Sequence, residues 1–377
     1  MYIPATVLGL IVLFIGVPIL SAHTQDVASH NNTILISTNM QERIDMLIFI
    51  SPQYADDAEI TTTINSYVSS VKEDLGWNTK LILIHQENNS YKEIDQTIEL
   101  YYSVYPIKAC IIVGEDIDTA LAGDSGYMEK PSTIPWSTVG GETIYETSKQ
   151  GIVSKPYTTD ICVSLLYPTH ALDYQTKKSQ ITYAFNKFST QKNNYPKDIL
   201  VFESSDINKN SKGIYQSLSG YGNLYYFEDP SDSEVKTSLN KTYSMYFVHG
   251  HSNPSGTDIN SSKTGWFSAD NVDQLDTPFF GADGCYVNGW WSNQPDSNVL
   301  DPSINGTWYG SKIFTSKNVK VMALGLLSQN GFSYPVSFIE NALPDLLEGK
   351  TLAESMIGDT YVDNAIIIGD PTFHFTR

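Results

Sequence analysis

Short, continuous apolar runs recur along most of this chain, and they constrain its fold more than any other feature. The first three are DMLIFIS (45–51), KLILIHQ (80–86) and KACIIVG (108–114), with helical periodicity between them near 58–75 and 90–105. Apolar strands that alternate with amphipathic helices are typical of a parallel sheet covered on both faces. The later runs continue this pattern: ICVSLLY (161–167), DILVFE (198–203), NLYYFE (223–228), SMYFVHG (244–250), PFFGADGC (278–285), KVMALGL (320–326) and AIIIGD (365–370).

The chain divides where this alternation pauses. Residues 120–159 are rich in Gly, Pro, Ser and Thr, which indicates a long connection. Helical stretches resume at 175–190 and near 209–219. We therefore predict a three-layer α/β/α fold with mostly parallel sheets and two packed subdomains, 44–150 and 151–377.

The N-terminus indicates export. The first 22 residues contain no charged side chain, and an apolar run is followed by Ser21 and Ala22, as at a signal-peptide cleavage site. An uncleaved membrane anchor is the alternative, although Pro4 and Pro18 shorten the helix that it needs. Residues 23–43 are predicted to be a polar spacer, and the protein is expected to be secreted or held at the cell surface.

Composition excludes several classes of function. With 42 Asp and Glu against 23 Lys and Arg, the net charge is −19, which argues against nucleic acid as a partner. Three cysteines are too few for a disulfide scaffold or a four-cysteine zinc site. No glycine-rich phosphate loop is present, so we expect no nucleotide cofactor.

Two apolar runs end in residues that can do chemistry together. SMYFVHG and the next residue supply His249 and His251, and PFFGADGC supplies Cys285. Ligand sites of open α/β sheets lie beyond the carboxyl ends of the strands, and an imidazole near a thiol lowers its pKa or takes its proton. The alternative reading is a buried cysteine and a core histidine without a shared role.

A resemblance to a known family follows from these motifs. A strand that ends in His-Gly and a second strand that ends in a small residue and Cys resemble the caspase-like cysteine peptidases, and within them the gingipain-type family. The segments that carry this resemblance, from about residue 44 to 377, are DMLIFISPQYADD, KLILIHQ, KACIIVGED, CYVNG and NAIIIGDPTFHF.

The resemblance implies a caspase- or gingipain-like fold and an endopeptidase that hydrolyses protein or peptide substrates through a thioester. By match to the motif, Cys285 would be the nucleophile and His249 the general acid/base. The backbone N–H groups of Gly250 and Cys285 would form the oxyanion hole. Glu115, or Asp116 in its place, would orient the histidine. Phe332 would form an aromatic wall of the S1 pocket, with an ordinary loop aromatic as the alternative. Asp160 is a candidate for the acid of the S1 pocket, with a structural Asp at a strand start as the alternative.

The sequence departs from the family pattern at two places. Leu165 and Leu166 stand where relatives usually carry a Gly-Arg pair, and His251 follows His249-Gly250 in place of Ser or Gly. The residue preferred on the amino side of the cleaved bond therefore stays open, as does the oligomeric state.

Zinc and calcium are alternative ligands for this region of the chain. His249 and His251 could bind zinc, but Asn253-Pro254 follows instead of Asp-His, so no metal is assigned to the site. Structural calcium on Asp258, Asp270 and Asp283 is a further alternative. Cys110 and Cys162 fall within apolar runs and are expected to be buried thiols, with a disulfide between them as the alternative. The rival functions are a catalytically silent binding module and a metal-dependent hydrolase.

Overall fold

The fold is that of a computed structural model of the chain. Residues 42–377 form one compact unit. The predicted signal segment 1–22 lies outside the described residues, and so does the spacer 23–43 apart from Arg43. The structure describes residues 43–84, 90–117, 120–122, 130–139, 157–169, 172–190, 194–206, 211–253, 255–262, 265–284, 308–325, 338–358, 360–361 and 366–376.

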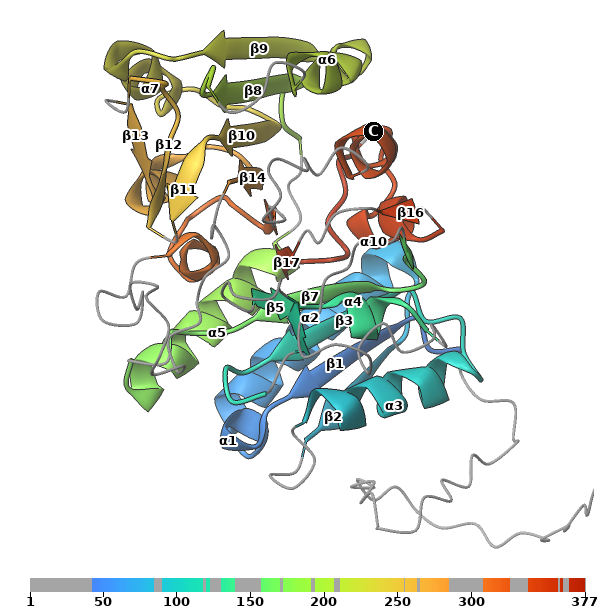
Figure 1. The fold of residues 1–377 in the computed structure, drawn as a ribbon. Helices are drawn as coiled ribbons and strands as arrows, with labels where there is room; N and C mark the ends of the chain where they lie inside the picture. Colours follow the sequence, from blue (N-terminus) through green and yellow to red (C-terminus); the bar gives the residue numbers. More distant parts are fainter. Residues whose placement is uncertain are drawn as a thin grey trace, which may run out of the picture. The chain divides into compact units, whose positions relative to one another are not determined.

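A ten-stranded sheet runs through the centre of this unit (Figure 1). Its order is β2-β1-β3-β7-β17-β15-β14-β10-β8-β9, and each strand matches one of the apolar runs. The predicted mostly parallel α/β fold is therefore confirmed. The strands are β1 (Met46–Ile50), β2 (Thr79–Leu83), β3 (Ala109–Val113), β7 (Cys162–Leu166), β8 (Asp198–Glu203), β9 (Asn223–Glu228), β10 (Met245–His249), β14 (Phe279–Asp283), β15 (Val321–Leu324) and β17 (Ile366–Gly369).

The sheet changes direction at one place. All neighbouring strands are parallel except β15 and β17, which are antiparallel. The strands from β2 to β17 therefore point one way and those from β15 to β9 the other. Because β7 and β17 pair into the half that contains β1 to β3, the sheet is continuous across the boundary predicted near residue 150.

The helices cover both faces of the sheet, because the chain passes from β1 to β2 and then back over β1 to β3. With right-handed crossovers, the two connecting helices must lie on opposite faces. On one face α2 and α5 pack together through Tyr67, Phe185 and Phe188. α3 contacts α4 through the Trp136 indole N–H, which donates to the Tyr91 carbonyl. The helices are α1 (Pro52–Ala55), α2 (Ala58–Leu75), α3 (Tyr91–Tyr102), α4 (Ile134–Ser137), α5 (Tyr174–Ser189), α6 (Ser211–Gln216), α7 (Asp232–Ser238), α9 (Leu343–Leu347) and α10 (Leu352–Met356).

The local sequence explains where α2 begins and ends. The Asp57 carboxylate accepts hydrogen bonds from the backbone N–H groups of Glu59 and Ile60, as an N-terminal cap does. Gly76 ends the helix with a φ of 69°, a left-handed conformation that glycine adopts at little cost. None of the helices in the described part of the chain is long and apolar enough to cross a membrane.

Shorter elements fill the connections. The region 120–159, expected to be a loop, contains short strands as well as α4 among its described residues. A three-stranded antiparallel sheet follows β10 directly. The short strands are β4 (Ala120–Ala122), β5 (Lys130–Ser132), β6 (Tyr157–Thr158), β11 (His251–Asn253), β12 (Gly256–Asp258), β13 (Trp266–Ser268) and β16 (Thr360–Tyr361), and the short helices are η2 (Ser217–Gly220), η3 (Ala269–Gln274), η4 (Tyr309–Phe314) and η5 (Phe338–Ala342).

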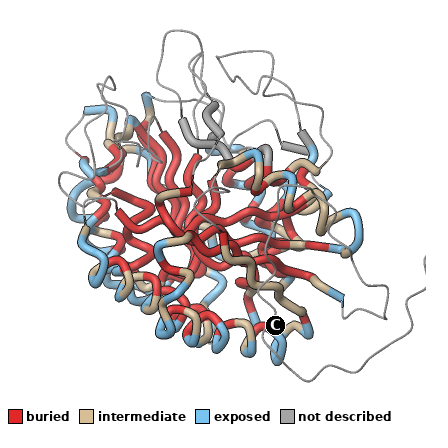
Figure 2. Tube along the Cα trace, turned by 90° about the horizontal axis from the view of Figure 1, so that it is seen from below, coloured by how far each residue is buried: buried red, intermediate tan, exposed pale blue. Residues whose placement is uncertain are grey.

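The buried residues follow the central strands (Figure 2). Alternation along a strand sends side chains to opposite faces, so Tyr246 and Phe280 pack with Phe267 on one face of β10 and β14. Phe247 and Phe279 pack together on the other face. That second face also carries His249, two residues after Phe247.

Candidate active site

The candidate site lies where the chain order reverses in the second half of the sheet. The chain runs from β8 to β9 and then crosses β8 to form β10, so the carboxyl ends of β8 and β10 make a topological switch point. Ligand sites of open α/β sheets lie at such points. Each of the two strands ends in an ionisable residue there, Glu203 on β8 and His249 on β10.

Glu203 and His249 form a buried pair. They are directly opposite in the β8–β10 register, and His249 Nδ1 lies 2.8 Å from Glu203 Oε1. His249 is 0% exposed and Glu203 is 1% exposed. The Tyr226 hydroxyl donates to the other carboxylate oxygen, Oε2. A carboxylate on Nδ1 fixes the tautomer and orientation of an imidazole, so Nε2 is the ring nitrogen that points away from Glu203.

Asp283 stands on the other side of the imidazole. It ends β14, opposite His249 in the register, and its Oδ2 lies 3.7 Å from His249 Nε2. Its side chain is buried, and burial raises the pKa of Asp283 to about 6, while the charge of His249 acts in the opposite direction. His249 Nε2 therefore points toward the end of β14, where the chain continues to Gly284 and Cys285.

The backbone is tightly packed at this point. Gly284 has a φ of 152°, and a Cβ there would lie 2.3 Å from the Gly250 carbonyl oxygen and 2.0 Å from Ser252 Oγ. A Cβ on Gly250 would lie 1.9 Å from the Asp258 carbonyl oxygen. Both glycines are thus required by close approach of neighbouring strands.

One predicted oxyanion-hole donor does not fit. The Gly250 backbone N–H donates to the Asp283 carbonyl at 3.2 Å, which extends the parallel β10–β14 ladder by one bond. This hydrogen bond uses the N–H that was expected to face the substrate. The Gly250 assignment is therefore wrong for this geometry, because strand pairing continues past the end of β10.

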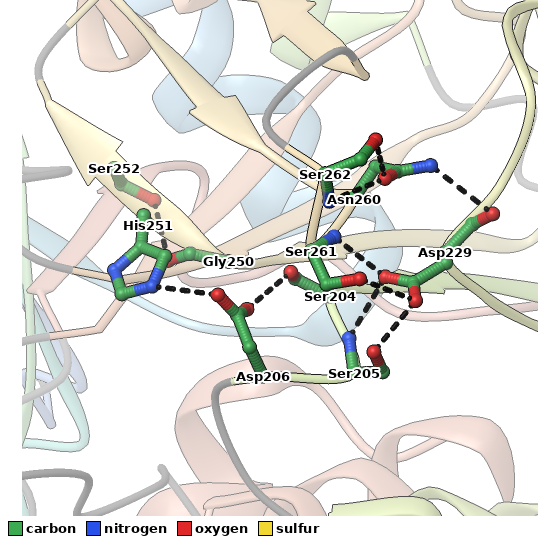
Figure 3. Close-up of polar contacts among 10 residues, drawn as sticks. All are labelled: Ser204, Ser205, Asp206, Asp229, Gly250, His251, Ser252, Asn260, Ser261 and Ser262. Atoms are coloured by element: carbon green, nitrogen blue, oxygen red, sulfur yellow. Dashed lines mark hydrogen bonds and ion pairs between the residues drawn. The ribbon is translucent and has the colours of Figure 1, made fainter.

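Polar contacts join the segments that follow β8, β9 and β10 (Figure 3). The imidazole of His251 contacts the Asp206 carboxylate at 3.3 Å, and Asp206 accepts a hydrogen bond from the Ser204 hydroxyl. Asp229 accepts from the hydroxyl and backbone N–H groups of both Ser205 and Ser261. These hydrogen bonds lower the pKa of Asp229 to about 2 and fix the loops around the carboxyl ends of β8 and β9.

The two histidines have separate partners. His251 is 46% exposed and pairs with Asp206, whereas buried His249 pairs with Glu203. Within the described ranges, no group of three or more His, Cys, Asp or Glu side chains is arranged to hold a metal ion. Two of the three aspartates considered for calcium also have different surroundings, since Asp270 pairs with Lys312 while Asp283 faces His249.

Glu115 follows the carboxyl end of β3, and this strand end lies on the opposite side of the sheet from the strand end that carries His249. This placement corrects the predicted role of Glu115. β3 runs antiparallel to β10 and is five strands away, or about 24 Å at the usual strand spacing. The Glu115 carboxylate pairs with Lys177 Nζ at 2.6 Å and accepts from the Tyr54 hydroxyl at 2.9 Å. Asp116, the alternative, is beside Glu115 and accepts from the Gln53 amide. Glu203 therefore holds the position at His249 that we expected Glu115 to occupy.

Of the other predicted site residues, the structure describes Asp160 but not Cys285 or Phe332. Asp160 precedes β7, four strands from β10, and its carboxylate accepts a hydrogen bond from the Val139 N–H at 2.9 Å. Its predicted contact with substrate stays a prediction. Cys285 and Phe332 lie outside the described residues.

Cys110 and Cys162 are buried free thiols, as predicted for residues within apolar strands. They lie on neighbouring strands β3 and β7, but in different register pairs. Burial raises the pKa of both thiols well above the ordinary value. Neither is suited to act as a nucleophile, because the thiolate is the reactive form.

Sequence reasoning missed Glu203, although the signal was present. DILVFE is an apolar run that ends in a carboxylate, just as SMYFVHG ends in His249 and Gly250. The strand order, which places β8 next to β10, is what joins Glu203 to His249.

Comparisons with known proteins agree with this architecture. No protein-family model matches the sequence, and no curated protein matches it either. Among solved structures, the arginine-specific cysteine proteinase gingipain R matches with a TM-score of 0.59 at 14% sequence identity, over 89% of this chain and 79% of that one.

Two other structures match only weakly. A periplasmic sugar-binding protein from Pseudomonas fluorescens has a TM-score of 0.18 at 9% identity, covering 75% of each chain. An ABC-transporter solute-binding protein from Burkholderia multivorans has a TM-score of 0.19 at 10% identity, covering 87% of this chain and 99% of that one. The match to gingipain R shows that the chain has the gingipain-like α/β fold of the caspase-like architecture.

Proposed function

We propose that this chain is a cysteine endopeptidase in which Cys285 is the nucleophile and His249 the general acid/base. One observation carries the proposal: a fully buried imidazole has its Nδ1 on the Glu203 carboxylate and its Nε2 directed at the end of β14. Cys285 is two residues beyond that strand end in the sequence. The fold shared with a cysteine proteinase supports the same reading.

Each group has a defined part in the proposed reaction. Glu203 accepts a hydrogen bond from Nδ1–H of His249 and stays ionised, so that Nε2 can take the proton of the Cys285 thiol. The thiolate attacks the substrate carbonyl carbon, and the Nε2 proton passes to the amine as the C–N bond breaks. Water, deprotonated by Nε2, then attacks the thioester and releases the acid and the thiol. We retain the Cys285 backbone N–H as a proposed donor to the oxyanion.

Hydrolysis of a mixed library of internally quenched peptides tests this function. The full chain should cleave peptides, and both Cys285→Ala and His249→Gln should abolish cleavage while the circular dichroism spectrum is unchanged. Activity that survives Cys285→Ala and is lost with a chelator would contradict the proposal and favour a metal-dependent hydrolase. No cleavage of any peptide by a folded chain with a reactive Cys285 would favour a binding module.

A further inference from the structure

The imidazole of His249 lies between two buried carboxylates, and the proposed reaction uses only one of them. Glu203 contacts Nδ1 at 2.8 Å, and Asp283 lies 3.7 Å from Nε2. We propose that Asp283 is a positioning residue that holds His249 in its charged form and directs Nε2 to the end of β14. This deepens the proposed function and depends on it for its catalytic meaning.

Strand register puts the second carboxylate there. Asp283 ends β14 directly opposite His249 on β10, just as Glu203 ends β8 directly opposite His249 on its other side. All three side chains thus leave the sheet on the same face. Because parallel strands are about 4.8 Å apart, each carboxylate is within contact range of the ring between them.

The neighbouring strand leaves room for this carboxylate. Gly325 follows β15, and its N–H donates to the Ala282 carbonyl at 2.9 Å. A Cβ on Gly325 would lie only 2.5 Å from Asp283 Oδ1. A pocket on the same face is lined by Phe247, Tyr215 and Phe338, and Asp283 is the charged group among its described lining residues. The site is therefore shaped around a buried acid.

Electrostatics explains why the acid needs the imidazole. Asp283 is 3% exposed, and neither of its oxygens accepts a well-formed hydrogen bond among the described residues, although the Gly284 backbone N–H acts on it. An ionised carboxylate in such surroundings is costly unless a cation lies close to it. The basic side chain that the described structure places beside it is His249.

The surroundings of His249 supply mainly negative charge. The pKa of Asp283, raised to about 6 by burial, means that this acid is ionised at neutral pH. An ionised Asp283 close to the ring favours the protonated imidazole, which in turn favours a thiolate on Cys285 and holds a proton on Nε2 for the leaving amine. The other ionisable groups on the elements around β10 include Tyr226 on β9, Asp206 after β8, His251 on β11, Asp258 on β12, Tyr215 and Lys212 on α6, and Glu340 on η5.

Histidine NMR on the full chain tests the proposal without any substrate. His249 would be assigned by its loss in His249→Gln, and its titration followed in the unmodified chain and in Asp283→Asn. We expect the His249 titration midpoint to move to lower pH by about 1 unit or more in Asp283→Asn, as for loss of an opposite charge within about 4–6 Å. The alkylation rate of Cys285 at pH 7 should fall by about tenfold.

Asp206→Asn is the matched control, because it removes a carboxylate at the same edge that pairs with His251 instead. It should move the His251 titration and leave the His249 titration in place. Coincident His249 titrations in Asp283→Asn and the unmodified chain would overturn the proposal. That result is independent of peptide cleavage, so failure of the proposed function and failure of this inference are separate outcomes.

A reciprocal measurement covers the case in which Asp283→Asn does not fold. Coupling between two sites is mutual, so replacing the base should change the acid. In His249→Gln, the pKa of Asp283 followed by its carboxyl carbon-13 signal should rise, because the favourable charge is gone. An Asp283 titration that is the same in both proteins would overturn the proposal.

Discussion

At the scale of single residues, the proposed function depends most on the buried contact between Glu203 and His249. The two side chains are almost completely excluded from solvent, and Tyr226 holds the far oxygen of the carboxylate. A carboxylate so placed fixes the tautomer of the imidazole and stabilises its charged form. Its removal should therefore affect the chemistry more than the fold.

Glu203→Gln tests this reading directly. The amide keeps the shape of the side chain but removes the charge, so His249 should lose its preferred tautomer. We expect kcat/KM for a cleaved peptide to fall by about 100-fold or more. Steady-state kinetics at neutral pH would measure the change, and a loss below about threefold would show that Glu203 does not act through His249.

Glu115→Gln is the matched control, with a different expected result. Glu115 is a buried acid of the other half of the sheet, and its partner is Lys177 at 2.6 Å. Removing one member of a buried ion pair leaves the other charge uncompensated, so unfolding free energy should drop by about 3–5 kcal/mol. Urea denaturation would measure this drop. Activity per folded molecule should be unchanged, in contrast to Glu203→Gln.

Part of the site could be predicted from the sequence. His249 was recognisable because His-Gly follows an apolar run, and the structure places it at a strand end, fully buried. Glu115 was assigned by match to the family motif after the third apolar run, yet its strand points the other way. Strand direction depends on which strands pair, and that information is not present in a single apolar run.

At the scale of elements, the site depends on how closely the chain after β14 approaches the short strand β11, which follows β10. Gly284 passes so close to Gly250 and Ser252 that no side chain fits there. The strands themselves follow from continuous apolar runs, and α2 was predicted with the bounds that the structure has. The small sheet β11-β12-β13 was not predicted, because its strands of three residues each carry no periodic signal.

Gly284→Ala should damage the site by forcing Gly284 away from Gly250 and Ser252. The added Cβ would meet backbone at 2.3 Å and would need a φ of 152°. We expect a loss of about 2 kcal/mol or more in unfolding free energy, with a larger relative loss of activity.

Gly213→Ala in α6 is the control for this change. Nothing lies within 4 Å of a Cβ at that position, so the change should stabilise the helix by about 0.5–1 kcal/mol. Thermal unfolding of both variants would measure the contrast. Equal stability of the two would contradict the close packing at Gly284.

At the scale of the whole molecule, the sheet consists of two halves with matching order. Read from each edge inward, β2-β1-β3-β7-β17 corresponds to β9-β8-β10-β14-β15. The switch point of the second half holds Glu203 and His249. In the first half, the equivalent register positions at the ends of β1 and β3 hold Ile50 and Val113. Of these two strand-end pairs, the one in the second half carries the acid and the base.

A buried acid at the site should make stability depend on pH. The pKa of Asp283 is raised from 3.8 to about 6 in the folded state, so the folded chain binds more protons than the unfolded chain between these values. Stability should therefore fall as pH rises from about 4 to about 6. The difference of about 2 pH units corresponds to about 3 kcal/mol.

Asp283→Asn should remove this dependence. It should raise the unfolding free energy at pH 8 by up to about 3 kcal/mol and change it little at pH 4. Urea denaturation at the two pH values would measure both. A variant that is less stable at pH 8 than the unmodified chain would show that the buried charge does not cost stability.

The alkylation rate of each cysteine in the native chain tests the central claim most directly. Iodoacetamide labelling followed by peptide mass spectrometry reports Cys285 together with Cys110 and Cys162, whose buried thiols serve as internal controls. We expect Cys285 to react much faster than both at pH 7, and His249→Gln to slow its reaction by about tenfold or more. Cys285 reacting at the same rate with and without His249 would contradict the account.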